Sequence, residues 1–151
     1  MKTNEILDHL FFINYELAFD KVDSYFEKLG FYNTAREESI LSFIDYDSDD
    51  VNGISWYTMN IVANKILNSS FRTTKEINLD AIRDYAQTKY SFSYQQEVDD
   101  IIIYKKDNLR LHFRTSSFPT PKFSKMMYQI TLFEPLTKQA DLTMMTPSLQ
   151  S

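Results

Sequence analysis

Two segments of this sequence have the spacing of amphipathic helices, and each is followed by segments of strand character. In the first, apolar residues recur at helical spacing from Ala18 to Leu29, and Gly30 ends the pattern as a left-handed helix cap would. The second runs from Leu79 to about Tyr90. The same order of elements therefore occurs twice, without a repeat in the sequence itself, and it predicts an α+β fold.

Runs of apolar and alternating residues predict the strands. We expect Leu41 and Phe43 to share one face of a strand, because side chains alternate along a strand. The polar stretch 68–75 is expected to be a loop, and 53–66 is either one long strand or two strands joined by a bend. Strands are expected at residues 9–14, 38–46, 53–66, 100–105, 109–116 and 126–133.

The length and composition indicate a single domain. A chain of 151 residues can bury most of its unfolded surface without a metal or disulfides. We expect one domain over residues 1–136 and a polar, partly ordered C-terminal extension over residues 137–151. Because the chain has 12 Phe, 10 Tyr and 1 Trp, it should contain either a dense aromatic core or a cavity lined by aromatic side chains.

The scarcity of glycine and cysteine excludes several functional classes. Gly occurs only at positions 30 and 53, which rules out a glycine-rich phosphate loop or dinucleotide fingerprint. The lack of Cys rules out zinc ribbons, thiol nucleophiles and disulfide frameworks. Glu5 and Asp8 lie in the N-terminal segment where a signal peptide would have an apolar run. No apolar stretch approaches the length of a membrane span. We therefore expect a cytoplasmic protein with no cofactor and no membrane contact.

The net charge of −5 is distributed unevenly along the chain. By formal charge, residues 1–50 carry −8, residues 51–100 carry −1 and residues 101–151 carry +4. Two interpretations remain open. The acidic and basic ends could neutralise each other in pairs, or they could form an exposed field that steers a charged partner.

The acidic stretch DYDSDDVNG at residues 45–53 resembles a calcium loop only in part. Its alternating Asp residues fit the pattern, but Asp50 stands where the turn needs Gly, and Trp56 stands where the bidentate Glu belongs. The stretch is therefore interpreted as an acidic hairpin tip, with Gly53 supplying a positive φ. As an exposed acidic point it is a candidate contact for a basic partner, through Asp45, Asp47, Asp49 and Asp50.

A basic strand face is predicted in the last third of the chain. Arg110, His112 and Arg114 alternate with apolar residues, and Lys105 and Lys106 lie across the predicted hairpin. This face is either simply solvated or binds an anion or an acidic partner, through Arg110 and Arg114. Nucleic acid is disfavoured because the chain as a whole is acidic.

The chain has two histidines, His9 and His112. His9 sits in an apolar run and His112 between two arginines. An isolated His is more often structural or solvent-facing than a metal ligand, so the two are weak metal candidates only.

Residues 25–31, YFEKLGF, resemble the helix end of the vicinal oxygen chelate superfamily, which includes glyoxalase-like and bleomycin-resistance-like proteins. DHLFF at 8–12 is similar to that family's first strand, REESILSFIDY at 36–46 to the strands that follow, and MYQITLFEP at 127–135 to its closing strand. The resemblance implies two βαβββ-like modules that form a curved mixed sheet with two main helices.

The metal-ligand set of that superfamily is matched only in part. His9 aligns with the first ligand, but Thr131 stands at the position of the final Glu, and Asn60 is the nearest candidate for the remaining ligands. Catalysis there needs a metal with open coordination positions. The resemblance therefore implies a divergent, metal-free binding member in which the sheet encloses a cavity.

Three functional hypotheses follow. The first is a non-enzymatic binding protein for a small, partly apolar ligand, cationic in view of the acidic first half of the chain, with the cavity expected at a homodimer interface. For each lining candidate taken singly, a place in the core is the more common role. The second is an acidic inhibitor of the immunity, antitoxin or phage anti-defence kind, which blocks a basic enzyme or nucleic-acid-binding surface. The third is a metal enzyme of the same fold that uses His9 and His112. The lining candidates for the first hypothesis are Phe43, Trp56, Tyr57 and Tyr104.

Overall fold

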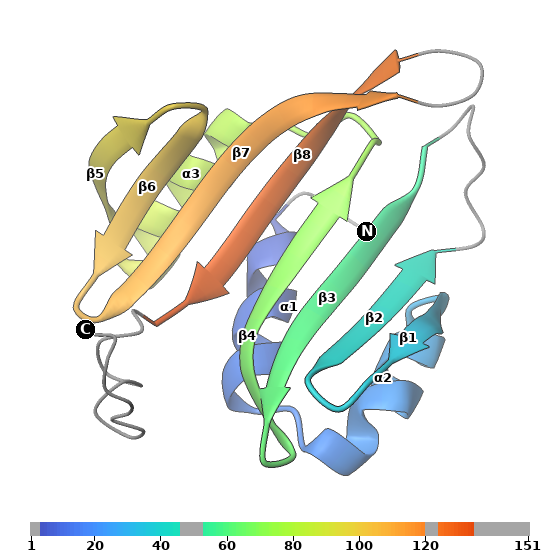
Figure 1. The fold of residues 1–151 in the computed structure, drawn as a ribbon. Coiled ribbons are helices and arrows are strands. Elements are labelled where there is room, and N and C mark those ends of the chain that lie inside the picture. The colour runs from blue at the N-terminus through green and yellow to red at the C-terminus, as the bar shows by residue number, and fades with distance from the viewer. Residues whose placement is uncertain (1–3, 46–52, 120–123, 135–151) are drawn as a thin grey trace, which may run out of the picture.

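The computed structural model describes residues 4–45, 53–119 and 124–134. These residues form three α-helices, a short 3-10 turn and one curved, open eight-stranded sheet, which confirms the predicted α+β class (Figure 1). In chain order the elements are α1 (Glu5–Tyr15), η1 (Phe19–Lys21), α2 (Val22–Lys28), β1 (Phe31–Arg36), β2 (Ile40–Asp45), β3 (Ser55–Val62), β4 (Lys65–Thr73), α3 (Leu79–Tyr90), β5 (Ser93–Val98), β6 (Ile101–Lys106), β7 (Leu109–Pro119) and β8 (Ser124–Phe133).

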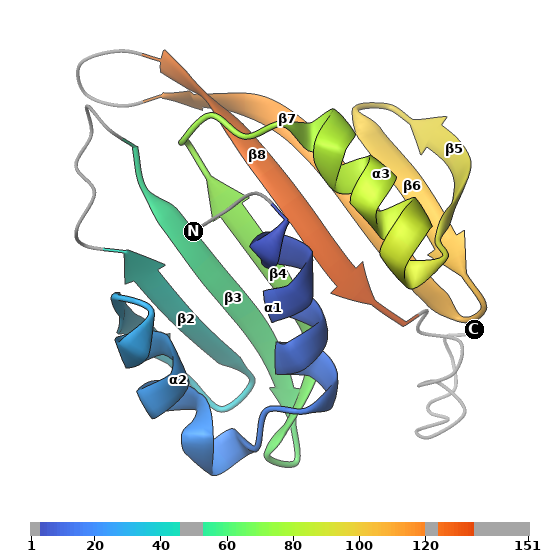
Figure 2. The same ribbon diagram turned by 180° about the vertical axis from the view of Figure 1, so that it is seen from behind.

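The sheet consists of two four-stranded halves that meet at its centre. The strand order is β1-β2-β3-β4-β8-β7-β6-β5, so β4 pairs with β8, and each half follows one or two helices. The helices α1, α2 and α3 all lie on the same face of the sheet (Figure 2). The doubled order of elements is confirmed. However, each module begins with a helix instead of a strand, and every described strand pair is antiparallel, so the sheet is not mixed.

The expected strand at residues 9–14 is wrong, because this segment lies in α1. Its buried residues are Ile6, Leu7, Leu10 and Ile13, which form one stripe at helical spacing. The stripe begins before His9, so the apolar run alone shows only its second half. α1 packs this stripe across the sheet, mainly over β4.

The expected loop at residues 68–75 is also wrong, because most of it belongs to β4. Phe71 and Thr73 point toward the helices and are buried, whereas Arg72 lies on the opposite face. β4 pairs on both sides, with β3 and β8, so its polar side chains occupy the centre of the sheet. Residues 53–66 hold two strands, and Ala63 and Asn64 form the bend between them at φ 51° and 60°.

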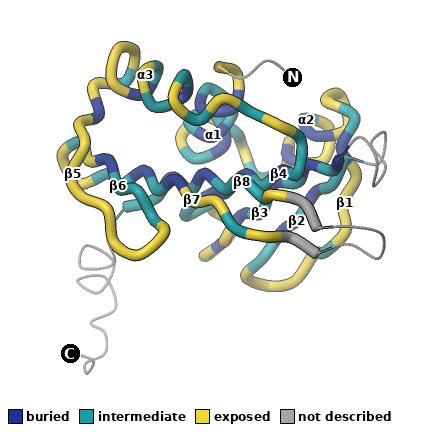
Figure 3. Tube along the Cα trace, turned by 90° about the horizontal axis from the view of Figure 1, so that it is seen from above, coloured by how far each residue is buried: buried dark blue, intermediate teal, exposed yellow. Residues whose placement is uncertain are grey.

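Other local predictions are confirmed. Leu41 and Phe43 are buried together on the helix-covered face of β2. The hairpin of β6 and β7 turns at Asp107, which adopts φ 52°, and Gly30 ends the first predicted helix at φ 86°. The two edge strands, β1 and β5, were not predicted; β5 is exposed at every position and rises from the plane of the sheet toward α3 (Figure 3).

The core lies between the helices and the sheet and is rich in aromatic rings. Phe26 of α2 stacks on Phe43 at a centroid distance of 4.4 Å, and Tyr57 lies 5.3 Å from Phe26 and 4.8 Å from Phe71. Tyr57 and Phe26 are fully buried. These aromatic residues therefore form a dense core, which is one of the two outcomes expected from the composition.

A polar contact joins the helices of the two halves. The carboxylate of Asp8 on α1 accepts hydrogen bonds from the hydroxyl groups of Tyr85 and Tyr90 and from the ammonium group of Lys89, all on α3. The distances from Tyr85 and Lys89 are 3.0 Å. Burial alone would raise the pKa of Asp8, but the bonds from Tyr90, Lys89 and Tyr85 together hold this pKa below its ordinary value.

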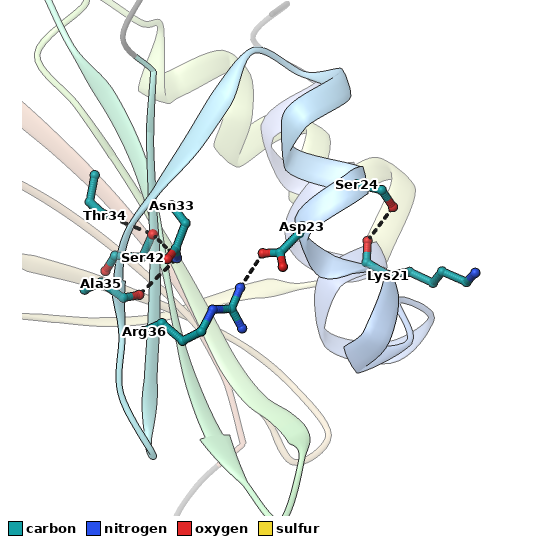
Figure 4. A network of polar contacts seen from close by, with 8 residues as sticks. All are labelled: Lys21, Asp23, Ser24, Asn33, Thr34, Ala35, Arg36 and Ser42. Atoms are coloured by element: carbon teal, nitrogen blue, oxygen red, sulfur yellow. Dashed lines mark hydrogen bonds and ion pairs between the residues drawn. The ribbon is translucent and has the colours of Figure 1, made fainter.

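A second polar network holds the edge strand β1 against α2 (Figure 4). Arg36 of β1 forms an ion pair with Asp23 of α2. At a bulge in β1, the side-chain amide of Asn33 donates to the carbonyl oxygens of Ala35 at 3.1 Å and Ser42 at 2.9 Å. The bulge and its polar cover leave this sheet edge poorly suited to pairing with another strand.

Parts of the predictions concern residues that the structure does not describe. Asp47, Asp49, Asp50 and the extension over 137–151 lie outside the described residues. None of the helices in the described ranges has the length and apolar character needed to cross a membrane.

Candidate functional site

A cleft of about 480 Å³ opens between α1, the end of α2 and the sheet, on the helix-covered side. This volume lies within the range of small-molecule sites, roughly 300–1,000 Å³. Its walls come from five stretches of the chain that are distant in sequence. The lining residues are Glu5, Ile6, His9, Lys28, Leu29, Phe31, Asp45, Ser55, Phe71, Thr73, Lys75, Glu76 and Ile77.

The apolar part of the cleft belongs to the core. Ile6, Phe31 and Phe71 are buried at 2%, 3% and 3% exposure, and each presents part of its surface to the cleft. Leu29 and Ile77 lie at its margin, and Leu29 is 36% exposed. Because these side chains are fixed by core packing, the apolar surface is preformed.

An ion pair stands at the rim. The ammonium group of Lys75 lies 2.8 Å from a carboxylate oxygen of Asp45, whose side chain is only 15% exposed. Gly53 allows this approach: it adopts φ +101°, and a Cβ there would lie 2.9 Å from Cγ of Lys75. The predicted positive φ at Gly53 is confirmed, and its consequence is the close packing of the two segments.

The hydroxyl groups of Ser55 and Thr73 add a directional acceptor. Thr73 Oγ1 donates to the carbonyl oxygen of Ile54 at 3.1 Å, so its single proton is used. In the 2.7 Å contact between Ser55 Oγ and Thr73 Oγ1, Ser55 is therefore the donor. The Ser55 oxygen keeps acceptor capacity beside the cleft and can receive a hydrogen bond from a ligand.

His9 lies on the cleft wall, where α1 crosses the sheet. Its Nδ1 atom forms a hydrogen bond with the hydroxyl group of Tyr25, and its ring lies 6.5 Å from that of Tyr57. Burial lowers the pKa of His9 below its ordinary value, although the carboxylates of Glu5 and Asp8 oppose this shift. The ring is therefore neutral at pH 7 and offers one donor and one acceptor.

The four aromatic candidates do not meet in one cavity. Phe43, Tyr57 and Tyr104 are core residues at 1%, 0% and 7% exposure, and Trp56 faces the other side of the sheet. Phe43 also touches a second recess of about 440 Å³ between α2 and β1, beside the Asp23–Arg36 pair. None of the four lines the cleft under α1.

The charged candidates lie in two separate places. Asp45 lies at the cleft rim, bound to Lys75. Arg110, His112 and Arg114 share one face of β7, as predicted, and this face points away from the helices. Lys106 does not join them, because it pairs with Leu109 on the helix-covered side.

The two histidines are not a metal pair. His9 lies on the helix-covered side and His112 on the open side of the sheet, where its ring contacts Phe133 at 4.7 Å. Within residues 4–45, 53–119 and 124–134, no group of three or more His, Asp or Glu side chains is placed to hold a metal ion.

The sequence did not reveal Lys75, Ser55 or Thr73 as site residues. Ser55 and Thr73 are directly opposite each other on β3 and β4, so the available signal was the alternation Phe71–Arg72–Thr73 that identifies a strand. The Lys75–Asp45 pair joins residues with no local pattern in common.

No protein-family model matches the chain, and no curated protein or solved structure matches it either. The class defined by its fold and site is therefore structural: an α+β protein in which helices cover one sheet face, no described element covers the other, and a small cleft lies under the first helix.

Proposed function

We propose that this chain is a non-enzymatic, cytoplasmic binding protein that takes a small, partly apolar ligand in the cleft under α1. The observation that carries this proposal is the cleft itself, in which a core-fixed apolar floor meets a polar rim. Small-ligand sites commonly combine these two features. The cleft is formed by a single chain, so the proposal does not require the homodimer expected from the sequence.

The polar groups favour a ligand with a hydrogen-bond donor, such as a primary amine. Ser55 offers an acceptor, and the rim carries the carboxylates of Glu5, Asp45 and Glu76 against the ammonium groups of Lys28 and Lys75. With His9 neutral, the formal charge of the lining is negative. A cationic amine with an apolar tail complements both parts of the cleft.

The test compares matched probes of opposite charge. Hexylamine and phenethylamine are expected to raise the thermal midpoint of the protein, whereas hexanoate is not, because a ligand that binds only the folded state stabilises it. His9 lies in the cleft and His112 outside it, so the proton resonances of the His9 ring should shift alone. Ser55→Ala should weaken the effect, and Ser24→Ala, at an exposed site on α2, should not. Shifts that are equal for amine and carboxylate would count against the proposal.

A distant relationship to the vicinal oxygen chelate superfamily is part of this proposal. The helix end at Leu29 and Gly30 and the doubled order of helix and strands support it. The helix-first modules and the helical segment that holds His9 depart from the expected pattern.

The second candidate function is an acidic inhibitor that blocks a basic enzyme or nucleic-acid-binding surface. It is favoured by exposed acidic side chains at the end of α1, in η1 and α2, and in the β1–β2 turn: Glu16, Asp20, Asp23, Glu27, Glu37 and Glu38. Such a surface would speed association with a basic partner in a salt-dependent way.

Immobilised oligolysine is a suitable probe for this candidate. Binding should weaken steeply as salt rises, and reversing the charges of Asp47, Asp49 and Asp50 together should weaken it further if the acidic tip takes part. A matched triple reversal at Asp20, Glu27 and Glu38 measures the helix-side group separately. Unchanged binding in both variants would contradict an inhibitor that acts through these acids.

A further inference from the structure

The sheet face that no described element covers, called the open face below, is cationic, although the chain as a whole is acidic. Cross-strand pairing places Trp56, Arg72, Gln129 and Arg114 side by side on β3, β4, β8 and β7. Lys105 pairs with Arg110 on the same face. This group of residues is called the open-face row below.

No acidic residue occupies a described strand position on this face. The described Asp and Glu residues lie on the helices, in the turns, or on strand positions that face the helices, as Asp45 and Glu97 do. Among the described residues, most ion pairs of acidic side chains are made with cations outside the open face, and only Arg114 of the open-face cations is in an ion pair. Asp8 and Asp45 pair with Lys89 and Lys75, which belong to the helix-covered side.

Arg72 is the central cation of the row. It is half-buried between Trp56 and Gln129, and its guanidinium group makes no ion pair or hydrogen bond with any residue in the described ranges. Burial lowers the pKa of Arg72, but an arginine remains charged at pH 7. A partly desolvated charge without a counter-ion is unfavourable, and an incoming anion would relieve this cost.

The flanking cations are available to different degrees. Arg110 donates to the carbonyl oxygens of Leu109 at 3.1 Å and Asp107 at 3.4 Å, contacts that leave its charge uncompensated. Arg114 lies 3.1 Å from Asp100, and both side chains are about half exposed, so this pair is weak and can exchange. Lys105 is exposed.

Neutral polar groups fill the space next to the row. Ser42, Thr58, Ser70, Thr131 and His112 lie on consecutive strands from β2 to β7, and the hydroxyl groups of Thr131 and Ser70 are 3.3 Å apart. These groups can donate or accept hydrogen bonds without adding charge. The face is thus both cationic and rich in hydrogen-bonding groups.

We propose that the open face of the sheet docks a carboxylate-rich segment of a protein partner. Arg72 and Arg114 are two strands apart, roughly 10 Å, and Arg110 and Arg114 are four residues apart, roughly 13 Å. The separation of roughly 13 Å matches carboxylates placed four residues apart on an extended chain, which lie on the same side of that chain. Arginine pairs with carboxylates through two parallel hydrogen bonds.

The charge distribution favours an acidic peptide over nucleic acid. The cationic area is limited to one face, and the rest of the chain brings the net charge to −5. A short acidic segment contacts only the cationic open face. A long polyanion would extend beyond this face and be repelled by the acidic side chains on the rest of the surface. This inference concerns a different surface from the cleft and does not depend on the ligand proposed there.

The experiment uses a short glutamate-rich peptide as the probe and Trp56 as the reporter. Trp56 is the chain's single tryptophan and lies in the open-face row, so its fluorescence should change saturably with the peptide. The ring resonances of His112 should shift, whereas those of His9 in the cleft should not. Binding should weaken as salt rises.

Two substitutions and one control decide the outcome. Arg72→Gln and Arg110→Gln should each weaken peptide binding about tenfold, since a charge-assisted hydrogen bond is lost. Arg83→Gln removes the same charge from α3, on the other side of the molecule, and should have little effect. Arg110 lies near the end of a hairpin, so its variant keeps the test valid if Arg72→Gln fails to fold.

Four results would overturn the proposal. The first is the absence of a saturable fluorescence change. The second is an equal loss in the Arg83→Gln control, which would mean that only net charge matters. The third is tighter binding of an oligothymidylate of the same charge, which would make nucleic acid the occupant. The fourth is self-association abolished by Arg110→Gln, which would make a second copy of the chain the occupant.

Discussion

The carboxylate of Asp8 on α1 and the hydroxyl group of Tyr85 on α3 lie 3.0 Å apart and join the two halves of the molecule on the helix side. On the sheet side the halves are joined by the pairing of β4 with β8. The α1–α3 contact therefore joins the two halves on the helix side as the β4–β8 pair joins them in the sheet. Because Asp8 lies near the surface, this contact is suitable for testing by substitution.

We expect Asp8→Asn to lower the free energy of unfolding at pH 7 by about 1 kcal/mol, because the amide accepts the three bonds less well. The effect is limited by solvent, since the Asp8 side chain is 37% exposed. Urea unfolding measures the change, and Asp84→Asn, at an exposed site on α3, is the control. Equal losses in the two variants would remove any special role for Asp8.

The same contact has a pH dependence with a defined sign. The pKa of Asp8 is lowered in the folded state, so its stabilising effect is present above the unfolded pKa, about 4, and is lost as the pH falls through the folded value. The difference between the parent protein and Asp8→Asn should therefore shrink on acidification. A difference that grows at low pH would contradict this assignment.

Arg110 should control the pKa of His112 and not that of His9. Burial lowers the pKa of His112, and the positive charge of Arg110 lowers it further. Arg110→Gln is therefore expected to raise the pKa of His112 in an NMR titration. His9, on the opposite side of the sheet, serves as the internal control, and a parallel shift of both histidines would indicate a general structural change instead.

Acidification should destabilise the protein through His9 as well. Its folded pKa lies below the ordinary value, so the unfolded state binds the proton more readily, and stability falls as the pH drops below about 6.5. His9→Gln should flatten this part of the stability profile measured by urea unfolding. A profile that keeps its slope after the substitution would place the titrating group elsewhere.

Gly53→Ala should destabilise the protein by about 2 kcal/mol, because the residue combines φ +101° with close packing against Lys75. Gly30→Ala is the matched comparison: its φ of 86° is closer to the left-handed region that other residues tolerate, so the expected loss is about 1 kcal/mol. Thermal unfolding distinguishes the two. If Gly30→Ala cost more, the packing at the cleft rim would be looser than described.

Phe43 and Ile44 test the assignment of faces on β2. Phe43→Ala should cost about 3–5 kcal/mol because it leaves a cavity against Phe26, whereas Ile44→Ala on the open face should cost less than half of that. Denaturant unfolding of the two variants provides the comparison. A larger loss at Ile44 would mean that the uncovered face carries the core.

The parts of the fold that local sequence determines were predicted well. The end of α2 depends on Gly30, and the start of α3 depends on Asn78, whose side chain accepts a hydrogen bond from the backbone of Ala81 at 3.0 Å. The alternation in β7 likewise fixed the faces of Arg110 and Arg114. In each case the deciding interaction lies within a few residues of the chain.

The errors concern segments whose structure depends on distant partners. β4 is polar because its outward side chains sit in the middle of a sheet with an uncovered face, and its inward Ser69 donates to the carbonyl oxygen of Leu10 in α1. Only the pairing with β8 makes it a central strand. For the same reason neither the role of Arg72 nor the cleft could be predicted from local pattern, because both arise where separate segments meet.

The position of β8 has a consequence for the order in which the molecule can form. β8 is the last described strand along the chain, yet it lies in the centre of the sheet between β4 and β7. During synthesis the backbone groups on the β8-facing edge of β4 remain unpaired until residues 124–133 have left the ribosome. Completion of the sheet is thus a late event that depends on long-range contacts, and a chain shortened before β8 would expose two aggregation-prone strand edges in place of one closed seam.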